Sequence, residues 1–196
     1  MISLIESRLA KYKPQTVNLK LPEAAVLIAI TNEKVPKVVL TKRAQQLSSH
    51  SGEIAFPGGK RDDSDRDLIH TALREACEEI ALNPDSVRVI STLDETVSLH
   101  NLKVTPCVGI IPADIELQAN LAELDCVFKV PLQFFLDQSN RCDHLDAYQS
   151  KGRFAPCYIF DGHLIWGLTC YMLIQFLNVT LDAEIKLHKR LPTLRV

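Results

Sequence analysis

The chain has 196 residues, of which 46% are hydrophobic and 23% are charged, so it has enough apolar side chains for a core and is not expected to be disordered. Its 22 basic and 24 acidic side chains give a net charge of −2, which argues against a dedicated nucleic-acid-binding protein, since such proteins usually carry a strong basic excess. The length fits one domain over residues 1–196.

The first half of the chain is predicted to begin with a helix and to continue mainly as strands. Apolar residues at helical spacing predict a short amphipathic helix, and this helix and the linker after it cover residues 1–20. Runs rich in Val, Ile and Leu predict strands, and the first two strands are expected to pair through a turn near residues 32–34. The predicted strands are residues 24–31, 37–43, 54–56 and 87–93.

A longer helix is predicted from Asp67 to Ile80, after a turn rich in aspartate. Ser64 or Asp65 is the expected N-cap, because short oxygen-bearing side chains satisfy the free N–H groups of a first helical turn. Pro84 is expected to stop the helix.

The second half is predicted to contain three strands and a long apolar helix. The strands are residues 104–111, 125–130 and 154–160. A turn or short helix is expected at 131–136, a polar loop at 138–153 and a tight turn at Asp161-Gly162. The apolar helix covers residues 164–179, and residues 180–196 form a C-terminal tail whose basic stretch, Lys186 to Arg195, is expected to be loosely held. Strands interleaved with helices predict an α/β (α+β) fold.

Six cysteines are spread through the chain without a Cys-x-x-Cys pair, so a zinc site is not indicated. Their mostly apolar neighbours favour buried free thiols in a reducing compartment. The N-terminus lacks the apolar core of a signal peptide, and residues 164–177 are fewer than the ~18–20 that a membrane span needs. We therefore expect a cytoplasmic protein without a membrane partner, in which this apolar stripe forms core or the surface of a homodimer.

The 67–80 helix carries the residues with the strongest chemical signal. Three carboxylates at helical neighbour positions repel one another by a few tenths of a kcal/mol per pair, and a divalent cation would remove that cost. A solvated acidic face is the alternative for such a helix alone, but the preceding Phe56-Pro57-Gly58-Gly59 loop favours a metal or phosphate site, because glycine lets the backbone approach a ligand closely. The residues are Arg74, Glu75, Glu78 and Glu79.

Gly59 and the Arg74-Glu75-x-x-Glu78-Glu79 run resemble the Nudix box, G-x5-E-x7-R-E-U-x-E-E-x-G-U, over residues 59–82. Two positions depart from it. Asp65 stands in place of the first glutamate, with eight rather than seven residues before Arg74. Ala81 replaces the last glycine and is expected to stay helical. The resemblance implies an α/β/α sandwich with a mixed β-sheet and a diphosphate hydrolase that uses Mg²⁺ or Mn²⁺.

The residues upstream resemble the signature of the coenzyme A pyrophosphatases within the Nudix superfamily. They run from Leu40-Thr41-Lys42-Arg43-Ala44 through Gly52 to the Phe56–Gly59 loop. Ser48 stands where the signature has arginine, so phosphate binding would need another cation. This resemblance implies hydrolysis of coenzyme A to 4′-phosphopantetheine and adenosine 3′,5′-bisphosphate.

The resemblance also assigns roles to residues. Glu75, Glu79 and Glu78 are the expected metal ligands, with the Gly58 carbonyl, and Arg74 orients a carboxylate. The general base is a helix glutamate or a later carboxylate, with Glu123 as the candidate ahead of Glu95 and Glu116. The expected substrate-binding residues are Arg43, Lys42, His50, Gly58, Gly59 and Lys60. Trp166 is interpreted as core packing, with stacking on adenine as the alternative.

Two other functions stay open on the sequence. One is Nudix hydrolysis of a different substrate, such as ADP-ribose or a dinucleotide. The other is a non-catalytic Nudix module that binds a nucleotide, against which the intact set of helix carboxylates argues.

Overall fold

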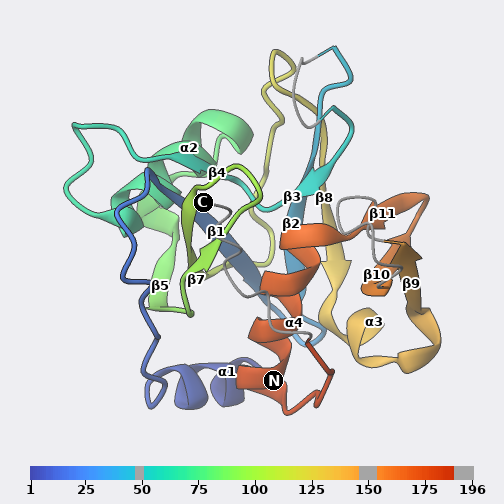
Figure 1. Cartoon of the computed structure of the whole chain (residues 1–196). Helices are drawn as coiled ribbons and strands as arrows, with labels where there is room; N and C mark the ends of the chain where they lie inside the picture. The colour runs from blue at the N-terminus through green and yellow to red at the C-terminus, as the bar shows by residue number, and fades with distance from the viewer. Residues whose placement is uncertain (47–50, 146–153, 188–196) are drawn as a thin grey trace.

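The computed structural model describes residues 1–46, 51–145 and 154–187, and its largest element is an eight-stranded mixed sheet (Figure 1). The strand order is β3-β2-β1-β7-β5, with β4 beside β1, β6 beside β7 and β8 beside β2. The strands are β1 (Glu23–Asn32), β2 (Lys37–Arg43), β3 (Ile54–Ala55), β4 (Gly58–Lys60), β5 (Arg88–Thr92), β6 (Thr96–Val97), β7 (Lys103–Pro112) and β8 (Leu124–Pro131).

The central strand β1 is paired differently along its two edges. On one edge it runs parallel to β7 over its whole length. On the other edge its first residues, Ala24 to Val26, pair with β4, and it meets β2 only where Ile30 faces Val38. The two strands of the first hairpin therefore separate, and β4 occupies the space beside the start of β1.

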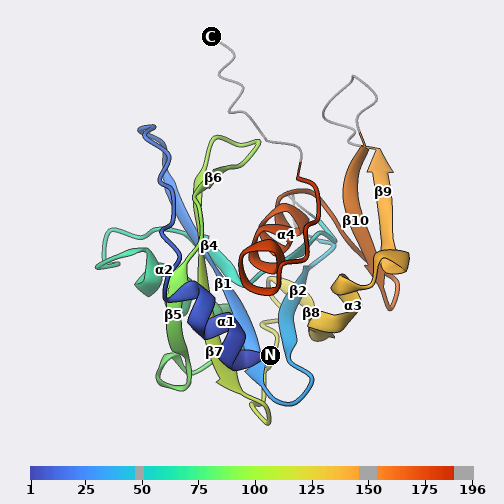
Figure 2. The ribbon, with the colours of Figure 1, turned by 90° about the horizontal axis from the view of Figure 1, so that it is seen from below.

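Helices cover both faces of this sheet, which confirms the expected α/β/α sandwich (Figures 1 and 2). Because side chains alternate along a strand, β1 contributes to two cores. Ala25, Leu27 and Ala29 pack against α2 (Leu68–Ile80). Ile28 and Ile30 belong to the core that contains α1 (Ile2–Leu9) and α4 (Gly167–Leu181).

A separate three-stranded sheet, in the order β11-β10-β9, follows the helix α3 (Leu132–Leu136) and the 3-10 turn η2 (Gln138–Asn140). Its strands are β9 (Arg141–Leu145), β10 (Phe154–Phe160) and β11 (His163–Ile165). The predicted 138–153 loop is wrong for η2 and β9, while residues 146–153 lie outside the described part. The long apolar helix begins at Gly167 and not at residue 164, because residues 163–165 pair with β10.

The expectation of six buried free thiols is wrong for four cysteines. Cys142 and Cys157 face each other on β9 and β10 and form a disulfide, a pairing that depends on the hairpin register and not on any sequence pattern. Cys77 is exposed on α2, and Cys126 is partly exposed, whereas Cys107 and Cys170 are buried thiols.

The ends of α2 also differ from the prediction. Asp67, not Ser64 or Asp65, is the N-cap, and its carboxylate accepts a hydrogen bond from the His70 amide. The helix ends at Ile80 without help from Pro84, which begins the short turn η1 (Pro84–Ser86). Ala81 is not helical: it adopts the left-handed conformation, with φ of 54°, that ends many helices and that glycine adopts most easily.

The C-terminal tail is held against α4 as far as Ile185, which precedes the stretch predicted to be loosely held. Asn178 exchanges two hydrogen bonds with the backbone of Ile185, and the Ile185 side chain is buried. Residues 188–196 lie outside the described part of the chain. Among the described residues, no helix has both the length and the apolar character that crossing a bilayer requires.

Candidate functional site

The Phe56–Lys60 segment lies between β1 and α2, and its two glycines leave no room for a side chain. Gly58 pairs with Val26, and a Cβ on Gly58 would lie 2.3 Å from the Ala25 carbonyl oxygen. A Cβ on Gly59 would lie 2.4 Å from the carboxyl carbon of Glu75. The missing side chains therefore allow the loop to contact both the sheet and the acidic helix.

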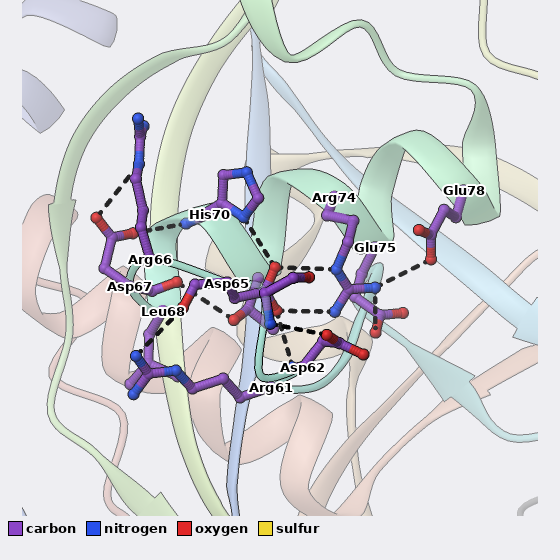
Figure 3. A network of polar contacts seen from close by, with 12 residues as sticks. Arg61, Asp62, Asp65, Arg66, Asp67, Leu68, His70, Arg74, Glu75 and Glu78 are labelled. Atoms are coloured by element: carbon purple, nitrogen blue, oxygen red, sulfur yellow. Dashed lines mark hydrogen bonds and ion pairs between the residues drawn. The ribbon is translucent and has the colours of Figure 1, made fainter.

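Arg74, in the middle of α2, is the centre of a polar network (Figure 3). Its Nε and Nη2 atoms each donate to one oxygen of Asp65 at 3.0 Å, which is the two-point geometry that a guanidinium and a carboxylate favour. Its Nη1 atom donates to Glu75 and to Glu78, each at 3.0 Å, and Nη2 also reaches the Lys60 carbonyl at 3.1 Å. Arg74 thus joins the loop to two of the helix carboxylates.

Asp65 has a structural role that the sequence left open. Its side chain is fully buried and also accepts a hydrogen bond from the Asp62 amide at 2.9 Å, with His70 Nδ1 2.8 Å from its other oxygen. Hydrogen bonds from Arg74 hold the pKa of the Asp65 carboxyl well below its usual range. The shorter side chain at this position of the box therefore still reaches the arginine.

Glu79 is the most buried acidic residue of α2, with 4% of its surface exposed. One carboxylate oxygen accepts a hydrogen bond from the Gly58 amide at 3.1 Å, and the other lies 3.9 Å from Arg43 Nη1. Burial raises the pKa of Glu79 to about 7, against the lowering effect of the Gly58 hydrogen bond. Burial likewise raises the pKa of Glu75.

Glu123, in the connection just before β8, is close enough to act on the carboxylates of Glu75 and Glu79. The Ala44 amide donates to the Glu123 carbonyl at 2.9 Å, which fixes this residue beside the end of β2. Its charge contributes to the raised pKa values of both Glu75 and Glu79, so the three carboxylates lie within electrostatic range of one another.

The other two candidates for a general base lie in different settings. Glu95 accepts hydrogen bonds from the Val17 amide at 2.7 Å and from the Thr105 hydroxyl at 3.4 Å, so it ties the N-terminal linker to the sheet. Glu116 is exposed on the connection after β7. No structural contact links either residue to the helix carboxylates within the described ranges.

The donor set fits a hard divalent cation, although no three His, Cys, Asp or Glu side chains in the described part of the chain already lie at metal-binding distance. Burial is the main cause of the raised pKa values of Glu75 and Glu79, and the charges of neighbouring glutamates raise them further; a bound cation would stabilise both carboxylates in their charged form. Glu75, Glu79, Glu78 and the Gly58 carbonyl are the groups that would hold such an ion.

Besides Gly58 and Gly59, the residues predicted to bind substrate lie in different settings. Arg43 faces Glu79, whereas Lys42 lies 3.5 Å from Asp125 and lines a cavity with the half-buried Trp166. Lys60 is exposed at the end of β4. His50 and Ser48 lie outside the described residues.

Comparisons with known proteins agree with this geometry. A family model described as a NUDIX domain matches residues 21–118. Proteins named uncharacterized Nudix hydrolase NudL, from Salmonella paratyphi B and Salmonella newport, are each 39% identical over 85% of this chain and 88% of their own length. The crystal structure of a MutT/nudix family protein from Enterococcus faecalis matches with a TM-score of 0.56 at 13% identity, covering 93% of this chain and 70% of that one, and it supports the fold alone.

Proposed function

Because the chain belongs to the Nudix family of hydrolases, we propose that it cleaves the diphosphate bridge of coenzyme A or of its acyl derivatives. The products are 4′-phosphopantetheine and adenosine 3′,5′-bisphosphate. The family membership itself makes the protein a hydrolase of nucleoside diphosphate derivatives, and the coenzyme A substrate is the finer proposal.

The observation that carries the proposal is the contact between Arg43 and Glu79. Arg43 belongs to the 40–59 signature that resembles the coenzyme A pyrophosphatases, and Glu79 belongs to the acidic helix. Their approach to 3.9 Å supports a common site, in which a substrate diphosphate would meet both the signature and the helix.

Each side chain of the site has a different role in the proposed reaction. Glu75, Glu78, Glu79 and the Gly58 carbonyl would hold Mg²⁺ or Mn²⁺, which when bound neutralises phosphate charge and makes water more acidic. Glu123 accepts the proton of the attacking water. Arg43 offsets the negative charge of the bridge, and Arg74 orients Glu75 and Glu78.

A comparison of substrates tests the proposal. Coenzyme A, ADP-ribose and a dinucleoside polyphosphate are assayed at equal concentration with Mg²⁺ and with Mn²⁺, and the products are identified. We expect coenzyme A to have the highest kcat/KM and to give the two products named above. Faster turnover of ADP-ribose would overturn the coenzyme A assignment and leave the hydrolase intact. Nucleotide binding without cleavage under either metal would favour the binding-module alternative.

Alanine substitutions at the two glycines of the loop are expected to affect different properties: stability at Gly58 and kcat at Gly59. At Gly58 the new Cβ meets backbone atoms of Ala25 and Val26, so the free energy of unfolding should fall by about 1–3 kcal/mol. At Gly59 it meets only the end of the Glu75 side chain, which can move away, so stability is kept while kcat falls by about 10²-fold. Thermal unfolding and steady-state kinetics of Gly58→Ala and Gly59→Ala distinguish the two. An equal loss of stability in both variants would contradict this account.

A further inference from the structure

A cavity of about 410 Å³ lies where β2 and β3 meet β11 and the start of α4, away from the acidic helix. We infer that this cavity binds the nucleobase of the substrate, and that the acyl-pantetheine end therefore lies outside it. The inference rests on the proposed function, because it assigns one end of the proposed substrate. The volume lies within the range of small-molecule sites, roughly 300–1,000 Å³.

Two aromatic rings line the cavity. Trp166 precedes α4 and is half-buried, so part of its indole remains accessible. His163, on β11, stacks on Phe128 of β8 with ring centroids 4.4 Å apart and an angle of 24° between the planes. Phe128 thereby holds the imidazole in a fixed plane beside the cavity. Stacking of a base on such a ring contributes roughly 1–3 kcal/mol.

The polar groups in the lining favour a base over a hydrocarbon chain. Lys42, Ser51 and Glu53 line the cavity together with the apolar side chains of Ile54 and Leu164. An acyl chain gains affinity from an apolar surface, whereas this lining carries charged and hydroxyl groups, with the Lys42 ammonium 3.5 Å from Asp125 and the Ser51 hydroxyl donating to the Gln45 carbonyl at 2.7 Å. A base has donors and acceptors along its edge, and the phosphate next to it would face the Lys42 ammonium.

The cavity is close enough to the carboxylate site for one nucleotide to reach both. Lys42 lines the cavity and its neighbour Arg43 faces Glu79, and an irregularity in the β2–β8 pairing between them interrupts the strict alternation of the strand. On the other wall, Ile54 precedes Gly58 by four residues, a distance of at most ~14 Å along an extended chain. A nucleoside diphosphate has a comparable length.

Trp166 is the only tryptophan of the chain, so its fluorescence reports on this cavity alone. Adenosine 3′,5′-bisphosphate and 4′-phosphopantetheine are titrated separately into the protein in Mg²⁺ buffer. Neither compound contains the diphosphate bridge, so neither is cleaved during the titration. We expect saturable quenching by the adenosine bisphosphate and no change with phosphopantetheine.

Variants extend the test to the rings and the cation. His163→Ala should weaken the adenosine bisphosphate by about 5–150-fold, which is 1–3 kcal/mol of stacking, and His163→Phe should restore most of the affinity because it keeps a ring on Phe128. Lys42→Met should also weaken binding. Lys34→Met is the matched control, because Lys34 is exposed in the turn at the opposite end of β2.

The outcomes separate this inference from the proposed function. Quenching by phosphopantetheine alone would assign the cavity to the acyl end and overturn the inference. Coenzyme A hydrolysis with no fluorescence response to either product would also overturn it, while the function stands. Quenching by the adenosine bisphosphate in a protein that does not cleave coenzyme A would support the base site and refute the proposed function.

Discussion

Glu79→Gln is expected to lower kcat by about 10³-fold without lowering the melting temperature. Glutamine keeps an oxygen that can accept the Gly58 amide hydrogen bond, but it lacks the charge that would hold a divalent cation. The charge is also costly to the folded protein, because Glu79 is buried and its carboxyl has a pKa raised to about 7. Steady-state kinetics with coenzyme A and thermal unfolding in the absence of metal measure the two effects.

Two further variants sharpen this experiment. Glu79→Ala removes the acceptor as well as the charge, so it should be less stable than Glu79→Gln by about 1–3 kcal/mol, the cost of a buried amide without a partner. Glu184→Gln makes the same charge change on an exposed residue after α4 and should leave both kcat and stability near the wild-type values. Wild-type kcat in Glu79→Gln would remove Glu79 from the metal site.

Asp65→Asn is expected to lower the free energy of unfolding by about 3–5 kcal/mol. The substitution removes the carboxylate that accepts two hydrogen bonds from the Arg74 guanidinium. It also replaces one accepting oxygen of Asp65 with an amide NH₂ group, which can only donate. Asp63→Asn is the matched control, because Asp63 is exposed two residues earlier and the charge change is identical. Chemical denaturation of the two variants gives the difference, and equal stabilities would show that the Asp65–Arg74 pair is energetically minor.

The same pair predicts a dependence on pH. The folded-state pKa of Asp65 lies well below its usual range, so the pair stabilises the protein fully above the ordinary carboxyl pKa and less as the pH falls. The stability difference between wild type and Asp65→Asn should therefore shrink on acidification below about pH 4. A difference that stays constant between neutral and acidic pH would mean that the Asp65 carboxylate does not contribute through its charge.

Those features of the fold that depend on neighbouring residues could be predicted from the sequence. The bounds of β2 and β10 match the predicted ranges, because alternation or a continuous apolar run is a local signal. The glycine loop and the acidic helix could also be recognised, since close backbone approach and carboxylates at helical spacing are properties of short segments.

Features that depend on distant residues could not be predicted. The Cys142–Cys157 bond requires the register of a hairpin whose first strand is polar. β11 lies within an apolar run that also suits a helix, and only its pairing with β10 separates the two. The left-handed conformation of Ala81 could not be predicted because alanine favours helices, although Ala81 occupies the position that is glycine in the Nudix box. The approach of Glu123 to α2 depends on the backbone of Asn120, whose amide donates to the Glu79 carbonyl at 2.8 Å and whose carbonyl accepts from the Glu123 amide at 2.9 Å.

The separation of β1 from β2, with β4 beside the start of β1, has an evolutionary consequence. The acidic helix packs against β1 and β4 in the middle of the sheet, whereas connections such as residues 113–123 lie outside the strand pairs. Insertions and substitutions in these connections leave the strand pairing intact. Descendants of one ancestor can thus acquire new substrate preferences while they inherit the same hydrolytic centre unchanged.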